Sequence, residues 1–123
     1  IGSFLSGLKH ELWGRFYESG ELKQEEKYSY GKLLNVSSFN LLDGNKIENS
    51  TFVDGNGQLY DYYENGNIFS ISNYQNGNLE GKYEEFHING KIAKRGKYSS
   101  NIKTGEWFEF SKRGLLKKRI QHD

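Results

Sequence analysis

The sequence predicts an all-β protein in which tandem β-hairpin repeats form an elongated antiparallel meander sheet. Three observations predict it: glycines recur at intervals of 22 to 24 residues, Asn-Gly and Asp-Gly pairs stand between apolar segments, and the 123-residue chain has no proline. Nine Tyr, eight Phe and two Trp supply much of its apolar content, and aromatic side chains fit the half-buried surface of a sheet. Central strands also need every backbone N–H, which proline lacks.

A first series of turns is marked by five glycines. These are Gly20, Gly44, Gly66, Gly90 and Gly114, at intervals of 24, 22, 24 and 24 residues. Eleven residues after each of the first four stands a second turn residue: Gly31, Gly55, Gly77 and Asn101. The segments between turns are about 6–8 residues long, which suits strands and is too short for stable helices. We therefore expect one array of about five repeats over residues 1–123.

The turn dipeptides support this interpretation. Asn-Gly occurs at positions 65–66, 76–77 and 89–90, and Asp-Gly occurs at positions 43–44 and 54–55. Both residues of such pairs tolerate the positive φ that tight hairpin turns require. The register reaches back to Phe4 and Gly7, so we expect an array that is truncated at its start or continues a longer one.

Alternation along the segments indicates two faces. Ile92 and Tyr98 share one parity, whereas Arg95 has the other. The preceding segments are less regular, because Trp107 and Phe110 have opposite parity. Either both faces carry aromatic residues, or a β-bulge realigns one of them. The sequence leaves these two alternatives open.

Composition argues against an enzyme and against a bound cofactor. The chain has no cysteine, and its three histidines are far apart in sequence, so we expect no metal or thiol site. The serines lack a Gly-x-Ser-x-Gly motif, and the glycines recur as turns rather than as a phosphate-binding loop. The adjacent carboxylates of Glu25-Glu26 and Glu84-Glu85 are expected to point to opposite faces of strands.

The net charge of +1 is unevenly placed. Residues 1–86 carry a net charge of −6, and residues 87–123 carry +7. The acidic part is suited to cover the basic site of a partner protein. The basic end is suited to an acidic protein, to anionic lipid or, as the least favoured class, to nucleic acid. A charged terminal strand that prevents edge-to-edge aggregation is the simplest interpretation of the same residues.

The candidate partner-binding residues combine aromatic anchors with these charges. Tyr and Trp are favoured at interfaces because they join a large apolar area to a polar group. The candidates are Tyr17, Tyr60, Tyr63, Phe108, Glu25, Glu26, Glu84, Glu85, Lys112, Arg113, Lys117, Lys118 and Arg119.

The segment from Tyr74 to Ile92 resembles the bacterial MORN-repeat variant. Its residues follow the pattern Tyr-x-x-Gly-x-Leu-x-Gly-x-aromatic-x-x-aromatic-x-x-x-Gly-x-aliphatic. The segment from Tyr98 to Leu116 resembles it again, and residues 12–31 and 59–77 match in part. Residues 33–57 depart from it, since Ser37 and Asn40 occupy the two aromatic positions.

The resemblance implies a β-hairpin array that serves as an interaction scaffold, and it carries no catalytic motif. Many bacterial members are YwqK-type antitoxins, which are thought to neutralise a toxin encoded beside them. We therefore expect a non-catalytic scaffold for protein–protein interaction, most specifically an antitoxin or immunity protein, with the bacterial cytoplasm favoured over the periplasm or cell surface. The alternatives are attachment to acidic lipid through the basic end and a passive segment of a longer surface repeat protein.

Overall fold

The computed structural model describes residues 3–5, 8–48 and 51–122. These residues form thirteen strands and no helix. The strands are β1 (Ser3–Leu5), β2 (Leu8–Phe16), β3 (Leu22–Ser29), β4 (Lys32–Val36), β5 (Phe39–Asn40), β6 (Lys46–Ile47), β7 (Gly57–Tyr62), β8 (Ile68–Gln75), β9 (Asn78–Leu79), β10 (Gly81–Phe86), β11 (Ile92–Ser99), β12 (Ile102–Phe110) and β13 (Leu116–His122).

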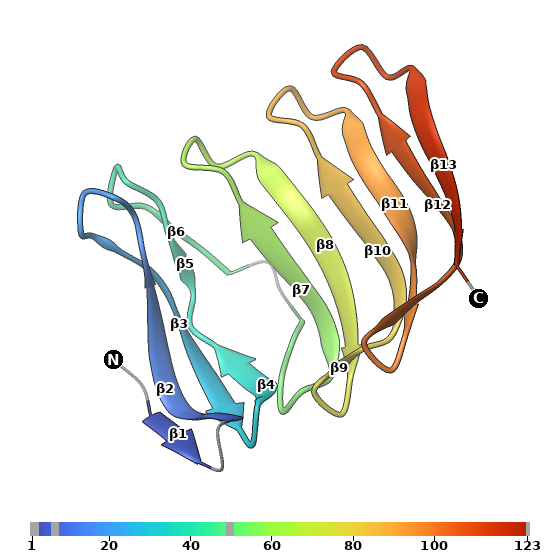
Figure 1. Ribbon diagram of the computed structural model, residues 1–123. Helices are drawn as coiled ribbons and strands as arrows, with labels where there is room; N and C mark the ends of the chain where they lie inside the picture. Colours follow the sequence, from blue (N-terminus) through green and yellow to red (C-terminus); the bar gives the residue numbers. More distant parts are fainter. Residues whose placement is uncertain (1–2, 6–7, 49–50, 123) are drawn as a thin grey trace.

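The strands follow one another as antiparallel hairpins along a single direction (Figure 1). The largest sheet has the order β13-β12-β11-β10-β8-β7, with the short strand β9 also paired to β8. A second sheet has the order β1-β2-β3-β4, and β5 pairs with β6. The predicted fold class is therefore confirmed: the protein is all-β, antiparallel and built of consecutive hairpins. Phe4 pairs with Lys9 in the first hairpin, and Gly7 lies outside the described residues.

The hydrogen-bonded ladder is interrupted between β4 and β7, where the sequence departs from the repeat. Strands β5 and β6 are only two residues long and form a separate hairpin. Here a small apolar core replaces the ladder. Phe39 is 1 % exposed and packs edge-to-face against Tyr62, with ring centroids 5.1 Å apart. Tyr17 completes this core, and Ile47 and Tyr60 pack around it.

All five turns of the first series have the same backbone hydrogen bonds. In the first of them the N–H of Gly20 donates to Tyr17 O, and the N–H of Tyr17 donates to Glu21 O, both at 2.9 Å. The fifth repeats this pattern at Ser111, Gly114 and Leu115. The glycine φ angles lie between 88° and 95°, so each loop needs a left-handed residue at this position.

The ladder shifts by one residue next to four of these turns, which is a recurrent β-bulge. The shifts lie at Arg15/Phe16, Asp61/Tyr62, Glu85/Phe86 and Glu109/Phe110. Aromatic residues nevertheless occupy both faces: Trp107 packs against Tyr98, whereas Phe110 stacks against Phe108. Both alternatives that the sequence left open are therefore present together.

The second series of turns has positive φ at two successive residues. The pairs are Tyr30–Gly31, Asp54–Gly55, Asn76–Gly77 and Ser100–Asn101. Positive φ at both central residues is the requirement of a type I′ turn, whose twist matches that of the flanking strands. The positions predicted from the second series of turn residues are thus confirmed.

Side-chain hydrogen bonds join successive hairpins at the first series of turns. The Tyr17 hydroxyl donates to Asn40 O at 2.9 Å, and the Tyr63 hydroxyl donates to Phe86 O at 2.6 Å. His87 Nε2 lies 2.8 Å from Phe110 O, so this nitrogen carries the proton that the carbonyl accepts. Each bond spans 23 residues. Such polar connections hold an array whose apolar content is only 34 %.

Candidate functional site

A row of aromatic residues lies on one face of the array, which we call the tyrosine face. It comprises Tyr28 on β3, Tyr74 on β8, Tyr83 on β10, Tyr98 on β11 and Trp107 on β12. Glu85 on β10 pairs with Ser70 on β8, and Ser70 pairs with Asp61 on β7. Because directly paired residues point to the same side of a sheet, these three side chains all lie on the tyrosine face. The other side of the sheet is called the opposite face.

The aromatic side chains of the tyrosine face contact one another across strands. The Tyr83 and Tyr98 ring centroids are 5.6 Å apart, and those of Tyr98 and Trp107 are 5.1 Å apart. Trp107 is 2 % exposed and its Nε1 donates to Lys97 O at 3.1 Å. Its ring lies directly over Gly96, where a Cβ would overlap it. The sequence therefore needs glycine at position 96 to seat the tryptophan.

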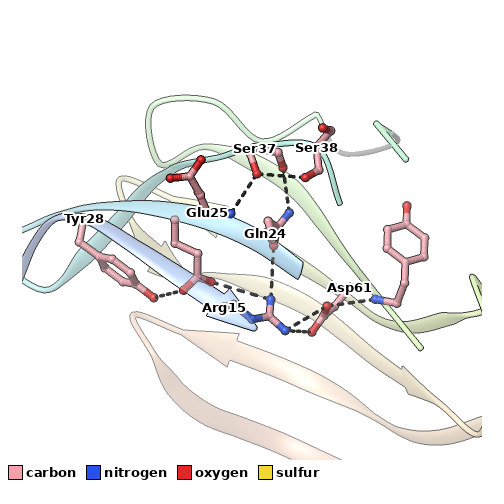
Figure 2. Close-up of polar contacts among 9 residues, drawn as sticks. Arg15, Gln24, Glu25, Tyr28, Ser37, Ser38 and Asp61 are labelled. Atoms are coloured by element: carbon pink, nitrogen blue, oxygen red, sulfur yellow. Dashed lines mark hydrogen bonds and ion pairs between the residues drawn. The ribbon is translucent and has the colours of Figure 1, made fainter. Parts of the chain in front are cut away.

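A polar hollow of about 420 Å³ opens on the tyrosine face between the first sheet and the largest sheet. Arg15 lines this hollow. Figure 2 shows that Arg15 lies in the middle of a set of polar contacts with Gln24 and Asp61. The Arg15 guanidinium contacts Gln24 Oε1 at 3.3 Å and Asp61 Oδ2 at 3.1 Å. Its Nη1 also lies 3.9 Å from Glu26 Oε2. A guanidinium is always charged, so these two carboxylates face a fixed cation rather than each other.

Two buried serines line the hollow. Ser70 is 6 % exposed and Ser72 is 8 % exposed. Gln24 is 3 % exposed and donates from Nε2 to Ser37 O at 3.0 Å, which fixes its side chain. The hollow thus combines a fixed cation, two carboxylates and small hydroxyl groups. These groups can donate and accept hydrogen bonds.

Two tyrosine hydroxyls of this face donate to carboxylates two residues away. Tyr28 donates to Glu26 Oε1 at 3.0 Å, and Tyr83 donates to Glu85 Oε1 at 2.8 Å. Burial, reinforced by these glutamates, raises the pKa of both tyrosines above the usual value. Burial raises the pKa of Tyr74 to about 12, with Glu26 as the next cause. All three are therefore neutral hydroxyl donors at physiological pH.

The paired glutamates separate between the two faces, as their alternation predicts. Glu26 and Glu85 belong to the tyrosine face, where they accept the tyrosine hydroxyls. Glu25 and Glu84 are their sequence neighbours in β3 and β10 and so point to the opposite face. Only one residue of each candidate pair can contact a partner bound on a given face.

Three of the predicted aromatic anchors make packing or hydrogen-bond contacts within the protein itself. Tyr17 is 6 % exposed and, with Tyr60 packed nearby, belongs to the small core beside β5. Tyr63 uses its hydroxyl to join two hairpins through Phe86 O. The fourth, Phe108, lies on the opposite face, where the Arg95 guanidinium carbon is 4.9 Å from its ring centroid.

The basic residues near the C-terminal end do not form one cluster. Lys112 and Arg113 belong to the last turn of the first series. Lys117 is the residue that the bulge in β13 leaves without a register partner. Lys118 pairs with Glu109, while Arg119 pairs with Phe108 and contacts Glu106 at 3.0 Å. The hairpin therefore divides these charges between a turn and both faces.

The contact between Arg15 and Asp61 in the hollow could not be predicted from the sequence. Arg15 and Asp61 are 46 residues apart and have no motif in common. Tyr28 and Tyr74, which are not among the candidate partner-binding residues, also line the hollow. The available signal was their shared repeat position, eight residues after a turn glycine, which puts them on one face.

Among the described residues, no group of three or more His, Cys, Asp or Glu side chains is arranged to hold a metal ion. No helix in the part of the chain that the structure describes is long and apolar enough to cross a membrane. Comparisons with protein-family models, with curated proteins and with solved structures find no match to this chain.

Proposed function

We propose that the protein is a non-catalytic scaffold that binds another protein on its tyrosine face. The observation that carries the proposal is the row of aromatic residues that crosses successive hairpins on this face. Tyr28, Tyr74, Tyr83 and Tyr98 are half-buried, so part of each side chain remains accessible. Tyrosine combines a large contact area with a hydroxyl group, and it is enriched among the residues that dominate binding energy at interfaces.

The tyrosines are held in place before any partner arrives. Tyr28 and Tyr83 are hydrogen-bonded to glutamates, and Tyr83 and Tyr98 pack edge-to-face. Ordering a flexible side chain at an interface costs about 0.5–1.5 kcal/mol, so side chains that are already fixed lose less on binding. The polar hollow beside them offers the hydrogen-bonding groups that accompany aromatic anchors in protein interfaces.

Neutralisation of a toxin is the most specific form of the proposal. The resemblance of residues 74–92 and 98–116 to the bacterial MORN-repeat variant supports it, because that family includes the YwqK-type antitoxins. The net charge of −6 over residues 1–86 also supports it, since an acidic surface is suited to a basic partner site.

Affinity capture of the tagged chain from its native lysate, at low and high salt, tests the proposal. We expect one stoichiometric protein that persists at high salt and is toxic when produced alone. Tyr98→Ala should release it, whereas Ile102→Ala, on the opposite face and 65 % exposed, should retain it. Thermal unfolding of each variant separates lost binding from lost folding.

The paired glutamates give a control of equal charge. Glu26→Gln with Glu85→Gln changes the tyrosine face, and Glu25→Gln with Glu84→Gln makes the same change on the opposite face. We expect the first pair alone to weaken capture. Equal capture by both pairs and by Tyr98→Ala would contradict binding on this face, and recovery of no protein would contradict the scaffold itself.

A further inference from the structure

A row of alternating basic and aromatic residues crosses the last three strands on the opposite face. Phe108 on β12 has Arg95 on β11 as one register partner and Arg119 on β13 as the other. The Arg95 guanidinium carbon lies 4.9 Å from the Phe108 ring centroid and 5.7 Å from that of Phe110. The two phenylalanine rings stack at 28° with their centroids 6.4 Å apart. Arg95 is thus held over an aromatic platform while it remains exposed.

Two lysines stand directly opposite each other beside this row. Lys82 on β10 and Lys97 on β11 are register partners, and like charges in this arrangement repel. The Lys82 ammonium reaches Glu84 at 3.7 Å. Lys97 and Arg95, by contrast, form no ion pair within the described residues 3–5, 8–48 and 51–122. An anion placed between the lysines would relieve their repulsion and give Lys97 a partner.

These residues surround a hollow of about 390 Å³, separate from the one on the tyrosine face. Lys82, Arg95, Lys97 and Phe108 line it together with Thr104 and Glu106. Its floor includes the backbone of Gly96 and Gly105. Gly105 has a φ of +67°, and the β11–β12 register shifts beside it, so a bulge shapes this floor. Glu106, the acidic lining residue, is already paired with Arg119 at 3.0 Å.

We propose that this hollow binds a short stretch of single-stranded nucleic acid. A backbone phosphate lies between Lys82 and Lys97, and a base packs against Arg95 above Phe108. Proteins that bind single strands combine a positively charged surface with aromatic side chains on which bases stack, and arginine adds cation–π contacts. Arg95 and Arg119 are far apart in the sequence. They alternate with Phe108 only because the cross-strand register places them on its two sides.

The arrangement favours a nucleic-acid strand over a membrane surface. A flat anionic membrane attracts clustered cations that reach it together. Here Lys82, Arg95 and Lys97 surround a hollow on a sheet face, whereas Lys112 and Arg113 belong to the last turn. A partner protein on the tyrosine face would leave this hollow free, so the inference is independent of the proposed scaffold function.

Fluorescence anisotropy with a labelled oligo(dT) measures the binding of the whole chain directly. The one phosphate held between Lys82 and Lys97 predicts a slope of about −0.7 in a plot of log affinity against log salt. Arg95→Gln with Lys97→Gln is expected to reduce the affinity about tenfold or more at low salt, since stacking and phosphate contacts are both lost. Phe108→Leu should weaken binding with no change in net charge.

The matched control is Lys94→Gln with Lys118→Gln. Both residues lie in the same two strands as Arg95 and Arg119 but pair with Glu109 on the tyrosine face. This variant changes the net charge by the same amount and should keep its affinity. Thermal unfolding confirms that each variant is folded.

Three outcomes would overturn the proposal. Equal loss of affinity in both double variants would mean non-specific attraction by the basic end. Absence of oligo(dT) binding at low salt would exclude the site. Binding of anionic vesicles or of a poly-glutamate peptide that needs Arg95 and Lys97, without binding of oligo(dT), would assign the hollow to another anion.

Discussion

Arg15 and Asp61 form an ion pair across the interruption in the ladder, although they are 46 residues apart. Arg15 Nη2 lies 3.3 Å from Asp61 Oδ1 and 3.1 Å from Oδ2, so the contact is made to both carboxylate oxygens. The pair joins β2 of the first sheet to β7 of the largest sheet, where no continuous strand pairing connects them. It therefore supports both the hollow and the relative position of the two sheets.

Asp61→Asn should lower the free energy of unfolding by about 1 kcal/mol, because the pair is partly exposed and screened by solvent. A double-mutant cycle with Arg15→Gln should show coupling of similar size, measured by urea unfolding. Glu64→Gln, an exposed carboxylate in the adjacent turn, is the control and should be close to neutral. Additive effects of the two substitutions would mean that the contact does not hold the sheets together.

Gly96→Ala should destabilise the protein by about 3 kcal/mol, because a Cβ there overlaps the ring of the buried Trp107. Gly14→Ala is the comparison: its Cβ would lie 2.8 Å from the Phe16 ring, but Phe16 is 54 % exposed and can turn away. Urea unfolding followed by tryptophan fluorescence measures both variants. Equal stability of the two would show that Trp107 does not need the space above Gly96.

Tyr63→Phe should cost about 1 kcal/mol, because it removes the hydroxyl that donates to Phe86 O at 2.6 Å. Tyr98→Phe removes a hydroxyl with no hydrogen bond among the described residues and should be nearly neutral. Thermal unfolding of both variants gives the comparison. If Tyr98→Phe proved the more destabilising, the bond between successive hairpins would not contribute as the geometry implies.

The fold can be predicted well from the sequence, because the residue types of each turn determine the backbone geometry of that turn. Asp54-Gly55 and Asn76-Gly77 show the positive φ values that their residue types favour. The interruption at β5 and β6 is harder to predict. Ser37 and Asn40 mark a departure from the repeat, but the replacement of the ladder by a core around Phe39 depends on tertiary contacts.

The candidate site is less predictable, because cross-strand register determines which side chains meet. Arg95 and Arg119 are 24 residues apart in sequence and become the two neighbours of Phe108 only in the folded sheet. Conversely, Tyr17 was predicted to contact a partner, and the structure gives it a hydrogen bond to Asn40 O inside the array. Whether the candidate residues contact a partner stays a prediction.

Stability should fall in alkaline solution as the tyrosines of the tyrosine face ionise. Burial raises the pKa of Tyr74 from its usual value of 10.0 to about 12, and it raises the pKa of Tyr28 and Tyr83 as well. The folded state disfavours the tyrosinate form, so this contribution is complete below pH 10 and is lost as the pH rises towards 12.

Urea midpoints measured from about pH 9 upwards, beside tyrosinate absorbance of the folded protein, test this expectation. Tyr74→Phe removes one of these ionisations and should reduce the alkaline loss of stability, while leaving the midpoint at neutral pH close to that of the unmodified chain. The reason is that Phe keeps the ring that packs against Phe52, with centroids 5.0 Å apart in the parent. Titration of all nine tyrosines together at the ordinary pKa, with no loss of stability above it, would contradict the burial of these hydroxyls.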